Sequence, residues 1–191
     1  MPVTRLDLRK TPKSLYSPPL GEVELVRVPT MKYIMVDGIG DPSGQAFQQA
    51  MSVIYNVAYM MKFRSKAQLK KDYSVVAPEG LWWMKGGGFD ASKRDAWLWT
   101  LMAVQEAKRK KNSPSLEKAR LESLAEGLCV QILHIGPCSS ESESIAKLYA
   151  YAKEHGYKMV GKHHEIYLGD PRRAAPSKLK TIIRHPVAKG S

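Results

Sequence analysis

Two glutamates with aromatic side chains close behind them are the residues of this 191-residue chain best suited to chemistry. Glu79 precedes Trp82 and Trp83, and Glu165 precedes Tyr167. A carboxylate beside aromatic faces can bind an organic cation or a flat, electron-poor ring through charge, stacking and cation–π attraction. In an apolar cleft a carboxyl group can also act as a general base, because burial raises its pKa.

These residues support a hypothesis for catalysis as well as for binding. Glu79 or Glu165 would deprotonate or hold a water molecule, and Tyr167 would donate a proton to a carbonyl oxygen or orient it. The residues expected to contact the ligand are Tyr55, Tyr59, Trp82, Trp83, Trp97, Trp99 and Cys138. Two alternatives stay open. The aromatic side chains could be ordinary core packing, since large aromatics dominate cores, and Glu165 could form a surface ion pair with Arg172 or Lys162.

A cysteine and a pair of histidines offer two further kinds of chemistry. Cys138 follows a Gly-Pro pair at an expected helix N-terminus, where the pKa of a thiol tends to fall, and His134 is the only nearby base. The alternative is a small residue that merely starts the helix. The run His-His-Glu at 163–165 lacks metal-site spacing, because adjacent strand residues point to opposite faces and no third ligand is suitably placed. The sequence therefore predicts no metal site and no cofactor.

Hydrophobic periodicity predicts the elements that position these residues. Apolar residues alternate in the predicted strands and recur every three to four residues in the predicted helices. The predicted strands are 22–28, 33–36, 72–84, 96–104, 128–135, 157–161 and 163–168, with 179–183 as a short helix or a last strand. The predicted helices are 43–62, 105–126 and 140–154, the last with Ser140 and Glu143 as a capping box.

The order of these elements repeats along the chain. Each half has a strand, a glycine turn, a helix and then strands with a glutamate and aromatics, so Glu79 and Glu165 fall in corresponding places. The predicted parts are an N-terminal arm at 1–20 and one domain at 21–191, whose halves at about 21–104 and 127–191 are joined by the helical segment 105–126. A pseudo-twofold pair of α+β halves would bring both glutamates near the junction, a common place for a ligand pocket.

Composition narrows the class of protein. Hydrophobic residues make up 43% and charged residues 25% of the chain, which is typical of a folded globular protein. No apolar run is long enough to cross a bilayer, residues 1–13 do not resemble a signal peptide, and the two cysteines predict no disulfide framework, so we expect a cytoplasmic protein. The net charge of +12 is scattered. We therefore expect a solvated basic surface rather than a nucleic-acid or membrane interface.

Five segments resemble the stand-alone members of the GyrI-like small-molecule-binding domain family. They are KDYSVV at 71–76, EGLWW at 79–83, WLWTLM at 97–102, EGLCVQILHIGP at 126–137 and HHEIYLGDPRR at 163–173. The similarity covers nearly the whole chain after the arm. It implies a duplicated strand-helix-strand-strand fold with an antiparallel sheet, two main helices and a ligand cleft along the pseudo-twofold axis.

The resemblance also implies a choice of functions. Related domains are drug-sensing modules of transcription regulators, in which an acidic residue meets cationic drugs. A stand-alone subfamily, the cyclopropanoid cyclopropyl hydrolases, hydrolyses cyclopropane-bearing DNA-alkylating compounds within an aromatic cage. Relatives often carry a tyrosine where this chain has Cys138, which removes one wall of such a cage.

We expect a xenobiotic-binding protein with a small-molecule partner and a possible hydrolase activity, because no DNA-binding domain accompanies the resemblance and detoxification is then favoured over direct regulation. The alternative is a non-catalytic regulator or topoisomerase-interacting protein. Such a protein would recognise a protein partner through its basic surface and the segment 105–126.

Overall fold

The computed structural model describes residues 4–6, 13–75, 77–86, 92–104, 118–170 and 173–190. The chain divides into two compact units. Unit 1 comprises Met1–Thr11 and Met31–Leu124, and unit 2 comprises Pro12–Thr30 and Ala125–Ser191. Each unit has one long helix and an antiparallel set of strands, so the predicted α+β class is confirmed. No helix in the described ranges combines the length and the hydrophobicity that a bilayer crossing demands.

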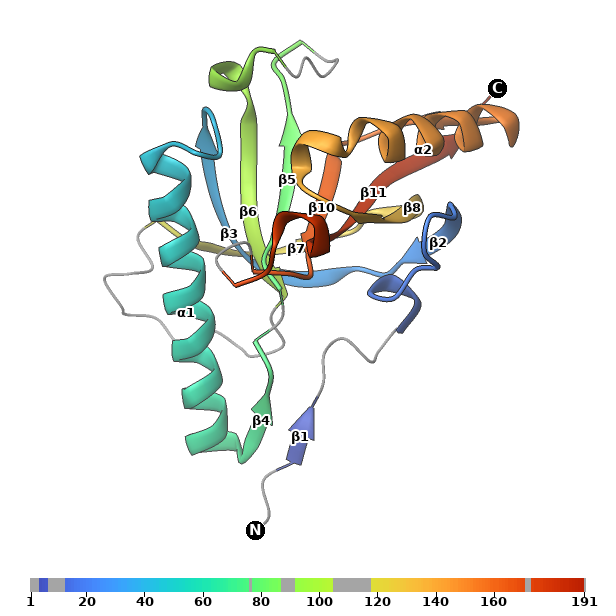
Figure 1. Cartoon of the computed structure of the whole chain (residues 1–191). Helices are drawn as coiled ribbons and strands as arrows, with labels where there is room; N and C mark the ends of the chain where they lie inside the picture. Colours follow the sequence, from blue (N-terminus) through green and yellow to red (C-terminus); the bar gives the residue numbers. More distant parts are fainter. Residues whose placement is uncertain are drawn as a thin grey trace. The chain divides into compact units, whose positions relative to one another are not determined.

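Unit 1 has four antiparallel strands in the order β7-β3-β6-β5. Their bounds are Met31–Ile39 for β3, Glu79–Trp83 for β5, Leu98–Val104 for β6 and Arg120–Leu124 for β7. Helix α1, Gln45–Leu69, packs on β3 and β6 (Figure 1). Two short strands, β1 at Thr4–Leu6 and β4 at Lys71–Tyr73, pair in parallel, and a 3-10 turn, η2, spans Arg94–Ala96.

Unit 2 has four antiparallel strands in the order β2-β8-β11-β10. Their bounds are Glu24–Val28 for β2, Gly127–Ile135 for β8, His163–Tyr167 for β10 and Lys180–Lys189 for β11. Strand β9, Tyr157–Met159, pairs with the far end of β11. Helix α2, Ser142–Glu154, packs on β8 and β11, and the 3-10 turns η1, η4 and η5 span Lys13–Leu15, Cys138–Ser140 and Pro176–Lys178.

The two units repeat the same topology. In unit 1, β3 is followed by α1, β5 and β6, and in unit 2, β8 is followed by α2, β10 and β11; in both, the last strand lies between the other two. A glycine with positive φ follows the first strand of each unit: Gly40 at 106° and Gly136 at 138°. Gly40 donates its N–H to Trp97, and Gly136 donates to Leu179. The predicted duplicated strand-helix-strand-strand module is therefore confirmed.

These glycines allow the strand registers of the two units to be aligned. Trp83 pairs with Leu98 in unit 1, and Leu168 donates its backbone N–H to Lys180 in unit 2. Leu98 directly follows Trp97, which accepts the hydrogen bond from Gly40. Lys180 directly follows Leu179, which accepts the hydrogen bond from Gly136. Trp83 is therefore the equivalent of Leu168. Each step back along β5 corresponds to one step back along β10.

The prediction that Glu79 and Glu165 occupy corresponding places is wrong by one residue. Counting back along the strands makes Trp82 the equivalent of Tyr167 and Glu79 the equivalent of His164. Because side chains alternate along a strand, a slip of one residue moves a side chain to the other face of the sheet. The sequence match of two glutamates was therefore misleading.

All three predicted helices differ from the structure. Helix α1 continues to Leu69, beyond the predicted end at residue 62. The segment 105–126 was predicted to be helical, but Arg120–Leu124 forms β7, because it completes the edge of β3 through backbone pairing that overrides helix propensity. Residues 105–117 of that segment lie outside the described residues. Helix α2 begins at Ser142 rather than at the predicted capping box, since the Ser140 hydroxyl donates to the Pro137 carbonyl at 2.8 Å.

The core of unit 1 depends on one close approach between a ring and a backbone. Trp99 is 1% exposed and lies directly across from Gly38 in the β3–β6 ladder. Its indole Nε1 donates to the Gly40 carbonyl at 3.2 Å. A Cβ atom added to Gly38 would lie 2.1 Å from the Trp99 ring, so only glycine leaves room for the indole there.

The substitution Gly38→Ala should therefore destabilise the protein. We expect it to lower the free energy of unfolding by about 3 kcal/mol, the upper end of the usual cost of overpacking, and to change the near-ultraviolet circular dichroism as Trp99 is displaced. Denaturant unfolding provides the measurement. Gly169→Ala is the control, because an added Cβ there meets only ordinary contacts, 3.4 Å or longer. Equal stability of the two variants would contradict this account of the core.

Candidate functional site

The tryptophans of unit 1 form part of its core. Trp82 stacks on Phe47 of α1 with ring centroids 5.6 Å apart, and Trp99 meets the same ring edge-on at 5.2 Å. Trp97 packs edge-on against Trp82 at 5.8 Å, and the guanidinium of Arg94 lies over it at 5.3 Å. Trp82 and Trp99 are buried, so these contacts account for both as core residues, the alternative left open by the sequence.

Other predicted residues of unit 1 differ in exposure. Glu79 is fully buried at the start of β5. It lies on the side of its sheet away from α1, because it is three positions from Trp82, whose ring contacts that helix. Trp83 and Trp97 are half-buried and keep part of their ring surface open. Ligand contact by these two rings stays a prediction.

Helix α1 carries an aromatic stripe along one side. The Tyr55 and Tyr59 rings stack at 6.5 Å, and the Phe63 ring follows at 6.3 Å. Tyr59 is 45% exposed and Phe63 is more exposed still. Residues four apart on a helix are neighbours, so the spacing that singled out the two tyrosines would also have found Phe63, which the sequence analysis missed.

Three groups that can donate a proton or bind a metal cation converge in unit 2. They are the Cys138 thiol and the Glu141 and Glu165 carboxyls. One ligand atom of each lies within 4.8 Å of the others. Cys138 opens the turn η4, Glu141 directly precedes α2, and Glu165 is the middle residue of β10. We call these three residues the acid cluster. Sequence reasoning missed Glu141, whose only signal was its place immediately before the helix.

Glu165 belongs to the face of the unit 2 sheet on which α2 packs. It pairs with Ile183 of β11, which is buried in the core cluster that includes Leu148 of the helix. Alternation along β10 places His163 and Tyr167 on the same face. The His163 Nε2 atom lies 3.2 Å from Oε1 of Glu165. This face therefore brings together a half-buried carboxylate, an imidazole and a phenol, as predicted for Glu165 and Tyr167.

Burial raises the pKa of Glu141 to about 9, and the negative charge of Glu165 contributes to the rise. Hydrogen bonds involving Cys138 and Thr181 act in the opposite direction but do not cancel it. Glu141 is 4% exposed, and its Oε1 atom has no hydrogen-bond partner among the described residues. At neutral pH this carboxyl group therefore holds a proton.

Of the two interpretations of Cys138 left open by the sequence, the structure does not support an activated nucleophile. Burial, together with the carboxyls of Glu141 and Glu165, raises the pKa of the Cys138 thiol to about 12, whereas a helix N-terminus was expected to lower it. His134 is also not placed as its base, because its ring nitrogens contact Ser144 at 3.0 Å and Ser140 at 3.2 Å. The thiol is therefore protonated and a poor nucleophile.

The opposite face of the unit 2 sheet carries a buried ionic network. Oε1 of Glu126 lies 2.9 Å from Nδ1 of His164, and Oε2 of Glu126 lies 3.5 Å from Nη1 of Arg184. Arg184 also donates to Gln131 at 3.0 Å and to the Leu15 carbonyl at 2.6 Å. Burial would raise the pKa of Glu126, but the interactions with His164 and Arg184 lower it overall. This network joins the turn η1 to the sheet and is structural.

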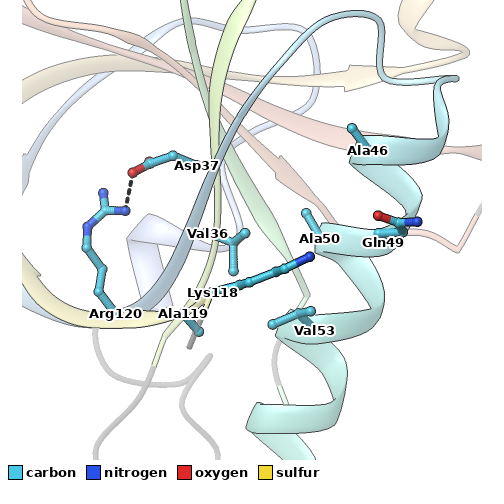
Figure 2. A pocket seen from close by; sticks show the side chains of 9 residues that line it. All are labelled: Val36, Asp37, Ala46, Gln49, Ala50, Val53, Lys118, Ala119 and Arg120. Carbon is cyan, nitrogen blue, oxygen red and sulfur yellow. Dashed lines mark hydrogen bonds and ion pairs between the residues drawn. The ribbon is translucent and has the colours of Figure 1, made fainter. Parts of the chain in front are cut away.

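Unit 1 also contains a groove of about 540 Å³ between α1 and the strands β3 and β7. Figure 2 shows Lys118 reaching toward α1 and an ion pair between Arg120 and Asp37 at one side. The other lining residues are mainly small and apolar: Val36, Ala46, Gln49, Ala50, Val53 and Ala119. None of the residues predicted to bind a ligand lines this groove.

The repeated topology and the carboxylate-bearing face define a duplicated α+β ligand-binding domain. The chain belongs to the family described as the GyrI-like small molecule binding domain, whose model matches residues 21–188. An uncharacterized conserved protein from Listeria innocua is 36% identical, with 96% of this chain and 100% of that chain covered and a TM-score of 0.87.

Two further solved structures are similar to this chain. A protein from Listeria innocua described as a hydrolase is 35% identical, over 97% of this chain and 100% of that chain, with a TM-score of 0.84. The EcmrR C-terminal domain is 15% identical, over 88% of this chain and 98% of that chain, with a TM-score of 0.63, which shows the fold alone. Among curated proteins, no relative of the chain was found.

The raised pKa of Glu141 gives the protein a specific dependence of stability on pH. Between the ordinary value of 4.5 and about 9, the folded state keeps a proton that the unfolded state releases. The free energy of unfolding should therefore fall as pH rises through this range, with a contribution from Glu141 on the order of 1 kcal/mol per pH unit. Glu141→Gln should remove that contribution and be most stabilising at the alkaline end.

Denaturant unfolding at several pH values measures this effect. Glu143→Gln is the matched control, because Glu143 lies on the same helix, is exposed and only pairs with Lys147 at 3.2 Å. The control should keep the wild-type slope. If Glu141→Gln and the wild type lose stability in parallel as pH rises, Glu141 is not the group that holds the proton.

Proposed function

We propose that this protein binds flat, partly apolar, often cationic small molecules at the Glu165-bearing face of unit 2, and that it hydrolyses strained electrophiles such as cyclopropane-bearing DNA-alkylating compounds. The observation that carries the proposal is the half-buried Glu165 carboxylate on one face with His163 and Tyr167. Membership of a small-molecule-binding family supports the binding. A relative described as a hydrolase supports the reaction.

A negatively charged Glu165 would give the proposed site a preference for cationic ligands. Its side chain is 13% exposed, so it is largely removed from water but still reachable. A buried carboxylate without a full counter-charge is costly, and an organic cation would supply that charge without a large desolvation cost of its own. The phenol ring of Tyr167, on the same face, adds a flat surface for stacking.

Hydrolysis needs a base for water and a proton donor for the substrate. Glu165 would take a proton from a water molecule while the oxygen of that water bonds to a cyclopropane carbon. The ring C–C bond breaks, and its electron pair moves through the conjugated system to the carbonyl oxygen, which receives a proton from Tyr167. Glu165 then returns a proton to Tyr167 through solvent, so the net change is the addition of one water.

The spacing of these two groups suits a conjugated substrate. Glu165 and Tyr167 are two residues apart on β10, which separates them by about 7 Å along the strand. That separation allows one group to serve the attacked carbon and the other to serve a carbonyl oxygen several bonds away. Water rather than Cys138 acts as the nucleophile, because the high pKa of the thiol keeps it protonated.

The test is incubation of the purified protein with a cyclopropane-bearing DNA-alkylating compound in a buffer that contains a chelator, followed by mass spectrometry. We expect the compound to gain one water. Glu165→Gln should slow the reaction about 100-fold or more, the usual contribution of a general base. Glu143→Gln, an exposed neutralisation on α2, should leave the rate unchanged.

The outcomes separate binding from catalysis. An unchanged compound that still raises the melting temperature of the wild type, but not of Glu165→Gln, would leave a binding protein and remove the hydrolase claim. Hydrolysis at the wild-type rate by Glu165→Gln would place the reaction elsewhere. Neither hydrolysis nor stabilisation, by this compound or by a flat aromatic cation, would overturn the whole proposal.

A further inference from the structure

We propose that the acid cluster of unit 2, Cys138, Glu141 and Glu165, is a binding site for a thiophilic divalent metal ion such as Zn²⁺. Hydrolysis and organic-cation binding do not require this metal, but the site shares Glu165 with them, so a bound metal ion would compete with an organic cation for that carboxylate. The site could not be predicted from the sequence, because its ligands lie on segments that are distant in the chain. Two of the three ligands come from a separate segment, at the start of α2.

The geometry is close to that of a zinc site. Zinc binds sulfur at about 2.3 Å and carboxylate oxygen at about 2.0–2.2 Å, so neighbouring ligand atoms in a tetrahedral site are about 3.3–3.8 Å apart. The three ligand atoms of the acid cluster already lie within 4.8 Å of one another. Small rotations of two glutamate side chains would close the remaining difference without movement of the backbone.

An unsatisfied oxygen is the second observation that points to a ligand. Glu141 is 4% exposed, and its Oε1 atom has no hydrogen-bond partner in the described part of the chain. A buried carboxyl oxygen without a donor costs free energy unless a proton or a cation satisfies it. A divalent cation at the centre of the acid cluster would replace the proton of Glu141 and supply one positive partner for both carboxyl groups.

The surroundings favour a metal of the zinc type. A thiolate ligand selects soft or borderline metals over Mg²⁺ and Ca²⁺, which prefer oxygen ligands only. The His163 ring, 3.2 Å from Oε1 of Glu165, would orient that carboxylate as an outer partner of the kind that metal ligands usually have. Cys138 is exposed, which provides an entry path and leaves a fourth coordination position for water.

Titration of the purified, metal-free chain with Co²⁺ tests the site, because a cobalt–thiolate bond gives a charge-transfer absorption band. We expect one Co²⁺ per chain, a band that Zn²⁺ abolishes by displacement, and loss of the band in Cys138→Ser. Cys129→Ser should keep it, since Cys129 is fully buried and is not part of the acid cluster. Glu141→Gln should weaken Co²⁺ binding at least tenfold.

A second measurement needs no substitution. In alkaline buffer, where more of the Cys138 thiol is ionised, Zn²⁺ should slow its alkylation by a maleimide at least tenfold. No thiolate band in the wild type, a band that persists in Cys138→Ser, or alkylation that Zn²⁺ does not slow would each overturn the proposal. The hydrolysis assay is run with a chelator, so failure of the metal site and failure of the proposed function are distinguishable.

Discussion

The alternation of side chains along β10 and β11 is the constraint on which the chemistry of unit 2 depends. The antiparallel register places Glu165 opposite Ile183 and His164 opposite Arg184. One set of side chains therefore faces α2, and the other faces away from it toward the turn η1. A shift of one residue in this register would exchange the two sets, so the pairing that builds the sheet also decides which charged residues can meet a ligand.

The two faces treat buried charge in opposite ways. On the η1 side, Glu126 has His164 and Arg184 as partners, and its pKa is lowered despite its burial. On the α2 side, Glu141 has another carboxyl group as its neighbour, and its pKa is raised to about 9. A paired network stabilises a fold, whereas a carboxyl group that lacks a counter-charge is poised to take one from outside. This contrast supports the proposed ligand site on the α2 side of the unit 2 sheet.

Much of the fold could be predicted from the sequence, because it depends on local periodicity. The two helices, the strands that carry the tryptophans and the repeat of the two halves all follow from the spacing of apolar residues and glycines. The register did not, since two glutamates in similar surroundings suggested an equivalence that the strand registers rule out, because Trp83 is the equivalent of Leu168. Glu141 was missed because its closeness to Glu165, which is distant in sequence, arises only in the folded chain.

The most direct test of the central claim is an experimental structure of the protein with a bound flat aromatic cation. We predict that the positive charge will lie within about 4–6 Å of the Glu165 carboxylate, the range over which an opposite charge favours its ionised form. A cation bound in the groove of unit 1 beside Ala50 and Arg120, with Glu165 unoccupied, would contradict the account.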